Sequence, residues 1–87
     1  MQSTAIIAAF RSREQTLKLL RIARENGIAC SAVNTPREAG VACGISVSFC
    51  PDCFPHIKRI ISCGGFERFI GFFKVTSAGY RTAVERI

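Results

Sequence analysis

Cysteine is the residue type with the most chemistry to offer in this sequence. The chain of 87 residues contains five cysteines. Two of them form a CxxC motif at positions 50–53, and a third is followed directly by glycine in Cys43-Gly44. Because a thiolate is both a nucleophile and a soft metal ligand, these positions suggest sulfur chemistry, thiol redox chemistry or metal binding.

The Cys50–Cys53 spacing has three interpretations. A thiol at a helix N-terminus ionises more readily, which favours redox chemistry, although Asp52 opposes thiolate formation. A metal site needs two further ligands, and Cys43 and Cys63 are expected at distant ends of other elements. The third interpretation is structural, with Cys53 packed in the core and Cys50 an incidental thiol. The residues alone favour this third interpretation, and Cys50 and Cys53 stay as weak metal-ligand candidates.

Cys43-Gly44 closes a loop that begins with the sequence Thr-Pro-Arg-Glu at positions 35–38. Gly44 permits a close backbone approach and unusual dihedral angles, and Arg37 could pair with an anion or favour a thiolate. A thiol on an exposed loop near Arg11 has the surroundings that a reactive cysteine needs. The structural alternative is a turn glycine beside a half-buried cysteine.

The overall charge points to anionic partners, because twelve Lys and Arg residues face six acidic ones, giving +6. The basic residues are scattered and no stacking motif is visible, so nucleic-acid binding is not expected. No apolar run approaches the roughly 18 residues of a membrane span, and no signal-peptide pattern is present. An odd cysteine count without an export signal indicates reduced thiols in a cytoplasmic protein with no membrane association.

Hydrophobic periodicity and capping residues place the elements that hold these cysteines. Ser12 and Gln15 have the spacing of a helix capping box, and apolar residues then recur at helical spacing up to the stop at Gly27. Asp52 is the expected N-cap of a second helix, because Pro55 must lie in its first turn. The strands are predicted at residues 4–10, 28–33, 45–49 and 66–75, and the helices at 13–26 and from residue 53 to the glycines at 64 and 65.

This order predicts a ferredoxin-like βαββαβ sandwich of class α+β, with an antiparallel sheet in the order 4-1-3-2. One domain is expected over residues 1–75, followed by a short C-terminal tail over residues 76–87 that holds at most a helical turn or two. In this topology the loop before Cys43 lies near the start of the first helix. Cys50 and Cys53 lie at the opposite end of the sheet.

The sequence resembles a family of small bacterial proteins described as putative selenium/sulfur carrier-like. The resemblance rests on Pro36-Arg37-Glu38 followed by Cys43-Gly44, and on the surrounding elements in the expected order. It covers most of the chain, and only the tail after Val75 is extra. The cysteines of the CxxC motif depart from the usual family pattern.

The resemblance implies that Cys43 is the carrier thiol, with Arg37 and Gly44 as its companions. The protein would then hold sulfur or selenium on Cys43 as a persulfide-type adduct. It would receive that atom from a donor such as a cysteine desulfurase, pass it to an acceptor protein, and need no cofactor. Such a protein is a carrier rather than an enzyme.

Two other functions are compatible with the residues. One is a regulatory or ligand-binding module in which Arg37 and its loop bind an anionic metabolite. The other is a metal or redox protein that uses Cys50 and Cys53, completed across a homodimer in the case of metal. The exposed edges of a small sheet are compatible with such a homodimer.

Overall fold

The computed structural model describes residues 2–40 and 42–87; Met1 and Val41, which fall in the predicted domain and loop, lie outside the described residues. The chain follows the predicted order and then adds one more strand. The elements are β1 (Gln2–Phe10), α1 (Arg13–Glu25), β2 (Cys30–Asn34), the short 3-10 helix η1 (Arg37–Ala39), β3 (Ile45–Phe49), the 3-10 helix η2 (Pro51–Cys53), α2 (Phe54–Ser62), β4 (Phe69–Ala78) and β5 (Arg81–Arg86).

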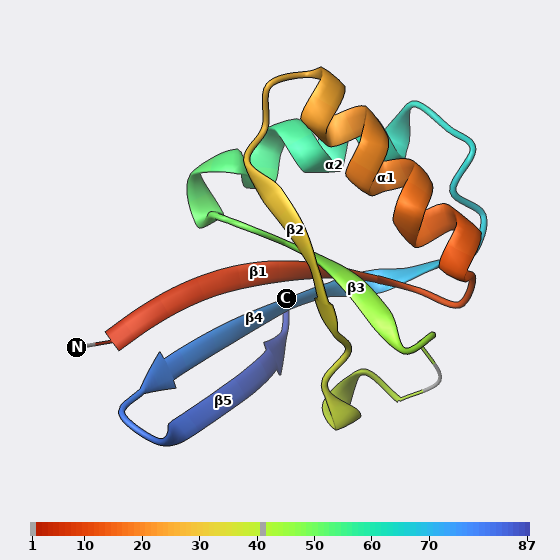
Figure 1. The fold of residues 1–87 in the computed structure, drawn as a ribbon. Helices are drawn as coiled ribbons and strands as arrows, with labels where there is room; N and C mark the ends of the chain where they lie inside the picture. The colour runs from red at the N-terminus through yellow and green to blue at the C-terminus, as the bar shows by residue number, and fades with distance from the viewer. Residues whose placement is uncertain (1, 41) are drawn as a thin grey trace.

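The strands form one antiparallel sheet in the order β2-β3-β1-β4-β5. The predicted neighbours 4-1-3-2 are all present, but a fifth strand beside β4 extends the sheet beyond the expected sandwich. Helices α1 and α2 lie together on one face of the sheet (Figure 1). None of the described helices is long and apolar enough to cross a membrane.

The C-terminal segment is a strand and not the helical turn that the sequence suggested. Strand β4 continues to Ala78, and β5 returns beside it with Val75 opposite Val84. Gly79 makes the turn possible because it has a φ of 62°, a left-handed conformation that suits glycine. The sequence of β5 lacks the alternation of apolar and polar residues that predicts a strand, because Val84 is its single strongly apolar residue.

Helix α1 begins at the predicted cap, but only half of the capping box forms. The Ser12 hydroxyl accepts a hydrogen bond from the Gln15 amide at 3.4 Å. The Gln15 side chain does not return to Ser12; its Oε1 instead accepts from the Arg68 amide at 2.9 Å. The residue expected to complete the cap therefore fixes the start of α1 to the segment that leads into β4.

The main core lies between the helices and the sheet. Alternate residues of β1, namely Ile6, Ala8 and Phe10, pack there with Leu19 of α1 and Ile57 of α2. Phenylalanine rings extend this core along the sheet, with centroid distances of 4.7–5.6 Å in the closest pairs. Burial of this face is what holds α1 and the end of β1 in fixed positions.

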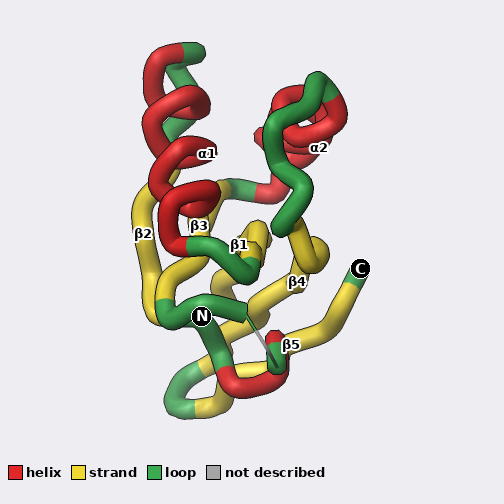
Figure 2. The backbone as a smooth tube through the Cα atoms, turned by 90° about the vertical axis from the view of Figure 1, so that its right-hand side faces the viewer, coloured by secondary structure: helices red, strands yellow, loops and turns green. Residues whose placement is uncertain are grey.

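A second, smaller core covers the opposite face of the sheet. Ile7 and Ala9 of β1 pack there against Phe73 of β4 and Ala39 of η1. Figure 2 shows η1 below the sheet, on the side away from α1 and α2. The helix-free face is therefore partly covered rather than open to water.

This covering changes the environment of β3. Ser46 alternates with the apolar residues of β3, a sequence pattern that predicts a solvent-facing side chain, but Ser46 is completely buried. Its hydroxyl lies 2.6 Å from the Thr35 hydroxyl, in the segment that leads into η1. The prediction was wrong because no local sequence pattern indicates that a loop covers this face. A hydroxyl that is paired with another hydroxyl tolerates burial there.

Candidate functional site

Cys43 lies where β1 ends and β3 begins. Its amide donates a hydrogen bond to the Phe10 carbonyl at 2.8 Å. The following residue, Gly44, accepts a hydrogen bond from the Thr35 amide at 3.0 Å, which closes the loop. The main chain on both sides of the thiol is thus fixed, and the loop lies beside the start of α1 as the topology predicts.

The Cys43 side chain points to the start of α1. Its Sγ is 3.1 Å from the Ile45 carbonyl oxygen and 3.4 Å from Oγ1 of Thr16. Cys43 is half-buried, whereas Thr16 is completely buried. A protonated thiol can donate to the Ile45 carbonyl, so this geometry suits the resting S–H group.

Thr16 of α1 is a residue of this site that could not be identified from the sequence. Its Oγ1 also lies 3.2 Å from the Ser12 carbonyl oxygen and 3.4 Å from that of Ile45. A hydroxyl has one proton and can rotate, so it can donate either to a carbonyl or to the Cys43 sulfur. When the thiol loses its proton, the Thr16 hydroxyl is the neighbouring donor, and the Ile45 carbonyl faces the sulfur as a repulsive dipole. No sequence spacing relates residues 16 and 43, so only the packing of α1 on β3 reveals the pair.

Gly44 does not need the unusual dihedral angles that the sequence suggested. Among the described residues it is not one of the glycines with positive φ. A Cβ built at Gly44 would meet no atom within 4 Å, and the residue is exposed. The side-chain position at Gly44 is therefore open, and no other segment of the described chain covers this residue next to Cys43 in the sequence.

Arg37 is exposed at the start of η1. Its carbonyl accepts a hydrogen bond from the Gly40 amide at 3.0 Å. Within residues 2–40 and 42–87, its side chain makes no hydrogen bond and no salt bridge. No polar contact therefore links the guanidinium of Arg37 to the Cys43 sulfur.

The other candidate thiols lie at the far end of β3. Cys50 is exposed and Cys53 is half-buried, and the Cys53 amide donates to the Cys50 carbonyl at 2.9 Å within η2. Cys30 of β2, which was not a candidate from the sequence, lies close enough to Cys53 to interact with it electrostatically. Burial raises the pKa of the Cys30 thiol, Cys53 adds to the rise, and Arg24 opposes it.

No disulfide links these thiols, and all five cysteines are free. In the part of the chain that the structure describes, no group of three or more His, Cys, Asp or Glu residues is placed to hold a metal ion. Cys50 and Cys53 are thus left as a pair of thiols without further ligands from the described residues of their own chain.

The amino-acid sequence of this chain matches a known protein family. The sequence pattern of the family described as Putative Se/S carrier protein-like matches residues 5–68. The matched segment contains β1 from residue 5 onward, α1, the Pro36-Arg37-Glu38 loop and Cys43-Gly44, and it ends before β4. No curated protein and no solved structure is significantly similar to the chain. Because the match spans most of the sequence, this chain belongs to the Putative Se/S carrier protein-like family.

Proposed function

We propose that this protein is a carrier that holds a sulfur or selenium atom on the thiol of Cys43. The observation that carries the proposal is the family match over residues 5–68, which includes the whole Cys43 loop. The position of the thiol supports it. Cys43 is half-buried, held by the main chain on both sides, and next to open space at Gly44.

Loading would proceed by transfer of a sulfane sulfur between thiols. The Cys43 thiolate attacks the outer sulfur of a persulfide on the donor protein, and a new S–S bond forms. The donor's own S–S bond breaks, and its electron pair leaves with the donor cysteine as a thiolate. Cys43 then carries one additional sulfur, and the proton lost from Cys43 neutralises the departing thiolate. No net oxidation occurs, and the same exchange with selenium as the outer atom would load selenium.

The surroundings of Cys43 determine where the added atom can lie. Toward α1 the sulfur is already in contact with Thr16 and the Ile45 carbonyl. Gly44, which follows Cys43 in the chain, is exposed, and apart from its two chain neighbours no described residue comes within 4 Å of a Cβ built there. We therefore place the outer sulfur, and the approach of donor and acceptor proteins, on the Gly44 side. A cysteine desulfurase is the class of donor that generates such a persulfide.

The proposal is tested by transfer of labelled sulfur. The protein is incubated with a cysteine desulfurase and ³⁵S-cysteine, then separated under non-reducing conditions and counted. Wild type should retain label that a thiol reductant removes, and Cys43→Ser should retain almost none.

Cys63→Ser is the matched control, because Cys63 is also a free cysteine but lies exposed at the end of α2. This variant should retain label like the wild type. Full labelling of a folded Cys43→Ser protein would show that Cys43 is not the carrier residue.

A further inference from the structure

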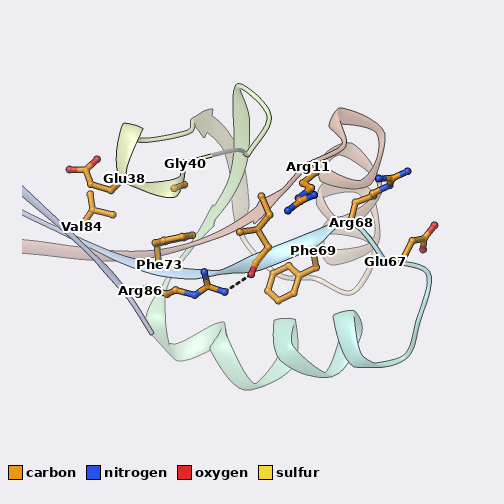
Figure 3. Close-up of a pocket in the computed structure, with 11 residues that line it drawn as sticks. Arg11, Glu38, Gly40, Glu67, Arg68, Phe69, Phe73, Val84 and Arg86 are labelled. Atoms are coloured by element: carbon orange, nitrogen blue, oxygen red, sulfur yellow. Dashed lines mark hydrogen bonds between the residues drawn. The ribbon is translucent and has the colours of Figure 1, made fainter.

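A cavity lies on the helix-free side of the sheet, between η1 and the first half of β4. Its volume is about 730 Å³, and Figure 3 shows the side chains that line it. The charged lining residues are three arginines and two glutamates: Arg11, Arg68, Arg86, Glu38 and Glu67. The remaining wall is largely apolar and includes Phe73 and Val84. This site differs from that of Cys43, whose sulfur faces α1 on the other side of the sheet.

Arg86 lies between the two ends of this cavity, and two contacts orient its exposed side chain. It is the cross-strand partner of Phe73, and its guanidinium carbon lies 5.8 Å from the centre of that ring. Its Nη2 donates a hydrogen bond to the Ile70 carbonyl at 2.7 Å (Figure 3). An arginine held by an aromatic face and a hydrogen bond loses little further freedom when it binds a ligand.

The sequence of β4 makes room for this guanidinium. Pairing with β1 shifts register between Ala9 opposite Gly71 and Phe10 opposite Phe69, which leaves Ile70 as the extra residue. A Cβ at Gly71 would lie 2.9 Å from Nη2 of Arg86. Glycine at this buried position therefore lets the guanidinium lie directly against the strand.

The donors of Arg86 are mostly unused. A guanidinium carries five N–H donors, and the described structure shows one side-chain hydrogen bond from Arg86. Among the described residues the one salt bridge joins Arg21 and Glu25, so no described carboxylate lies within salt-bridge distance of the Arg86 guanidinium. The two glutamates stand at opposite ends of the cavity, with Arg86 between them (Figure 3).

The planar guanidinium of Arg86 and the apolar side chains of Phe73 and Val84 together indicate which kind of ligand would fit this cavity. A guanidinium binds carboxylates and phosphates through paired hydrogen bonds, and an apolar wall favours a hydrophobic body attached to the anion. We propose that this cavity binds a small organic anion, with its carboxylate or phosphate on Arg86 and its apolar part against Phe73 and Val84. Arg11 and Arg68 line the same cavity and add positive charge to it.

Chemical-shift titration of the ¹⁵N-labelled protein tests this site directly. The probes are benzoate and phenylphosphate as anions, and benzyl alcohol as their uncharged counterpart. The anions should shift the backbone amides of cavity residues such as Gly40, Ile70 and Phe73. A stronger response to benzoate would identify a carboxylate ligand, and a stronger response to phenylphosphate would identify a phosphate ester. Both outcomes support the site.

Substitutions separate a specific site from general charge attraction. Arg86→Gln should weaken binding of the preferred anion at least about tenfold, as expected for loss of a charge-assisted hydrogen bond. Arg81→Gln is the matched control, because it removes the same charge from the same strand but Arg81 does not line this cavity. It should change the affinity by less than about twofold, since exposed charges at a distance are screened.

Three results would overturn the inference. They are the absence of shifts at the cavity amides, equal losses in Arg86→Gln and Arg81→Gln, and equal binding of benzyl alcohol. The test is independent of sulfur transfer, because Cys43→Ser should bind the anion like the wild type. A failure of the carrier proposal and a failure of this site are therefore distinguished by that variant.

Discussion

The sulfur of Cys43 has two immediate polar neighbours, the Thr16 hydroxyl and the Ile45 carbonyl oxygen. The hydroxyl can donate to a thiolate, whereas the carbonyl can only accept. Thr16 is also completely buried, so no water can readily replace its hydroxyl. Of the two neighbours, the Thr16 hydroxyl is therefore the one that we expect to assist a Cys43 thiolate.

Replacement of Thr16 tests this role. Thr16→Val keeps the shape of the side chain but removes the donor, so alkylation of Cys43 by iodoacetamide should slow about threefold or more, in line with a lost hydrogen bond to a charged atom. Thr16→Ser keeps the hydroxyl and should react like the wild type. Equal rates for the two variants would show that the hydroxyl does not assist the thiolate. Peptide mapping of the alkylated protein gives the rate at Cys43 alone.

Cys30 should behave in the opposite way to a reactive cysteine. Burial raises its pKa above the ordinary value of 9.0, with Cys53 adding to the rise and Arg24 opposing it. Since the thiolate is the reacting form, the midpoint of its alkylation rate against pH should lie above 9.0. The measurement is peptide mapping after short alkylation pulses at a series of pH values. A midpoint at or below 9.0 would mean that Arg24 outweighs burial.

At the scale of elements, the position of Arg86 depends on Gly71 of β4. A methyl group there would collide with the guanidinium, which is the end of a flexible side chain and can move away. Gly71→Ala should therefore change the free energy of unfolding by less than about 1 kcal/mol, since the lost contacts are offset by a less flexible unfolded chain.

The same variant should lose affinity for the preferred anion to an extent similar to Arg86→Gln. Gly44→Ala is the control, because a Cβ at that position meets no atom within 4 Å. Chemical denaturation and the anion titration measure the two effects. Normal anion binding by Gly71→Ala would show that the position of Arg86 is not set by this glycine.

The elements were predictable where local signals were strong. Helix α1 was predicted to within a residue, because Ser12 and Gly27 mark its ends and its apolar residues follow helical spacing. The β1–β3–β2 and β1–β4 neighbours also followed from the element order. Strand β5 was missed because its pattern is mostly polar, and the burial of Ser46 was missed because it depends on η1 covering the sheet.

The candidate site was predictable only in part. Cys43 and its loop were predicted from residue types and a family resemblance; the match over residues 5–68 confirms the family, and the role of Cys43 stays a prediction. Thr16, Arg68 and Arg86 were not identified, because each reaches its site through packing between elements that are distant in sequence. Gln15 shows the same dependence on packing. Its spacing from Ser12 predicted a capping box, but its side chain accepts a hydrogen bond from the Arg68 amide instead.

At the scale of the whole molecule, the β4–β5 hairpin and η1 together shield the face of the sheet that the helices leave uncovered. Phe73 is buried there, and Val84 of β5 packs against it. The residues after Ala78 are therefore part of the packed structure, although they lie outside the segment matched by the family.

Removal of residues 79–87 tests this contribution. The truncated chain loses the β4–β5 ladder and the cover over Phe73, so its free energy of unfolding should fall by about 2 kcal/mol or more. For a chain of this size that corresponds to a decrease in Tm of roughly 8–16 °C. Thermal unfolding followed by circular dichroism measures the change. An unchanged Tm would show that β5 does not stabilise the fold.

Intact-protein mass spectrometry with peptide mapping tests whether Cys43 is the residue that carries the added atom. Wild-type protein is incubated with a cysteine desulfurase and cysteine, and the mass is measured without reduction. If Cys43 is the carrier residue, one sulfur should be added on the peptide that contains Cys43, and a thiol reductant should remove it. Addition at Cys50 or Cys53 instead, or no addition at any cysteine, would contradict this role of Cys43.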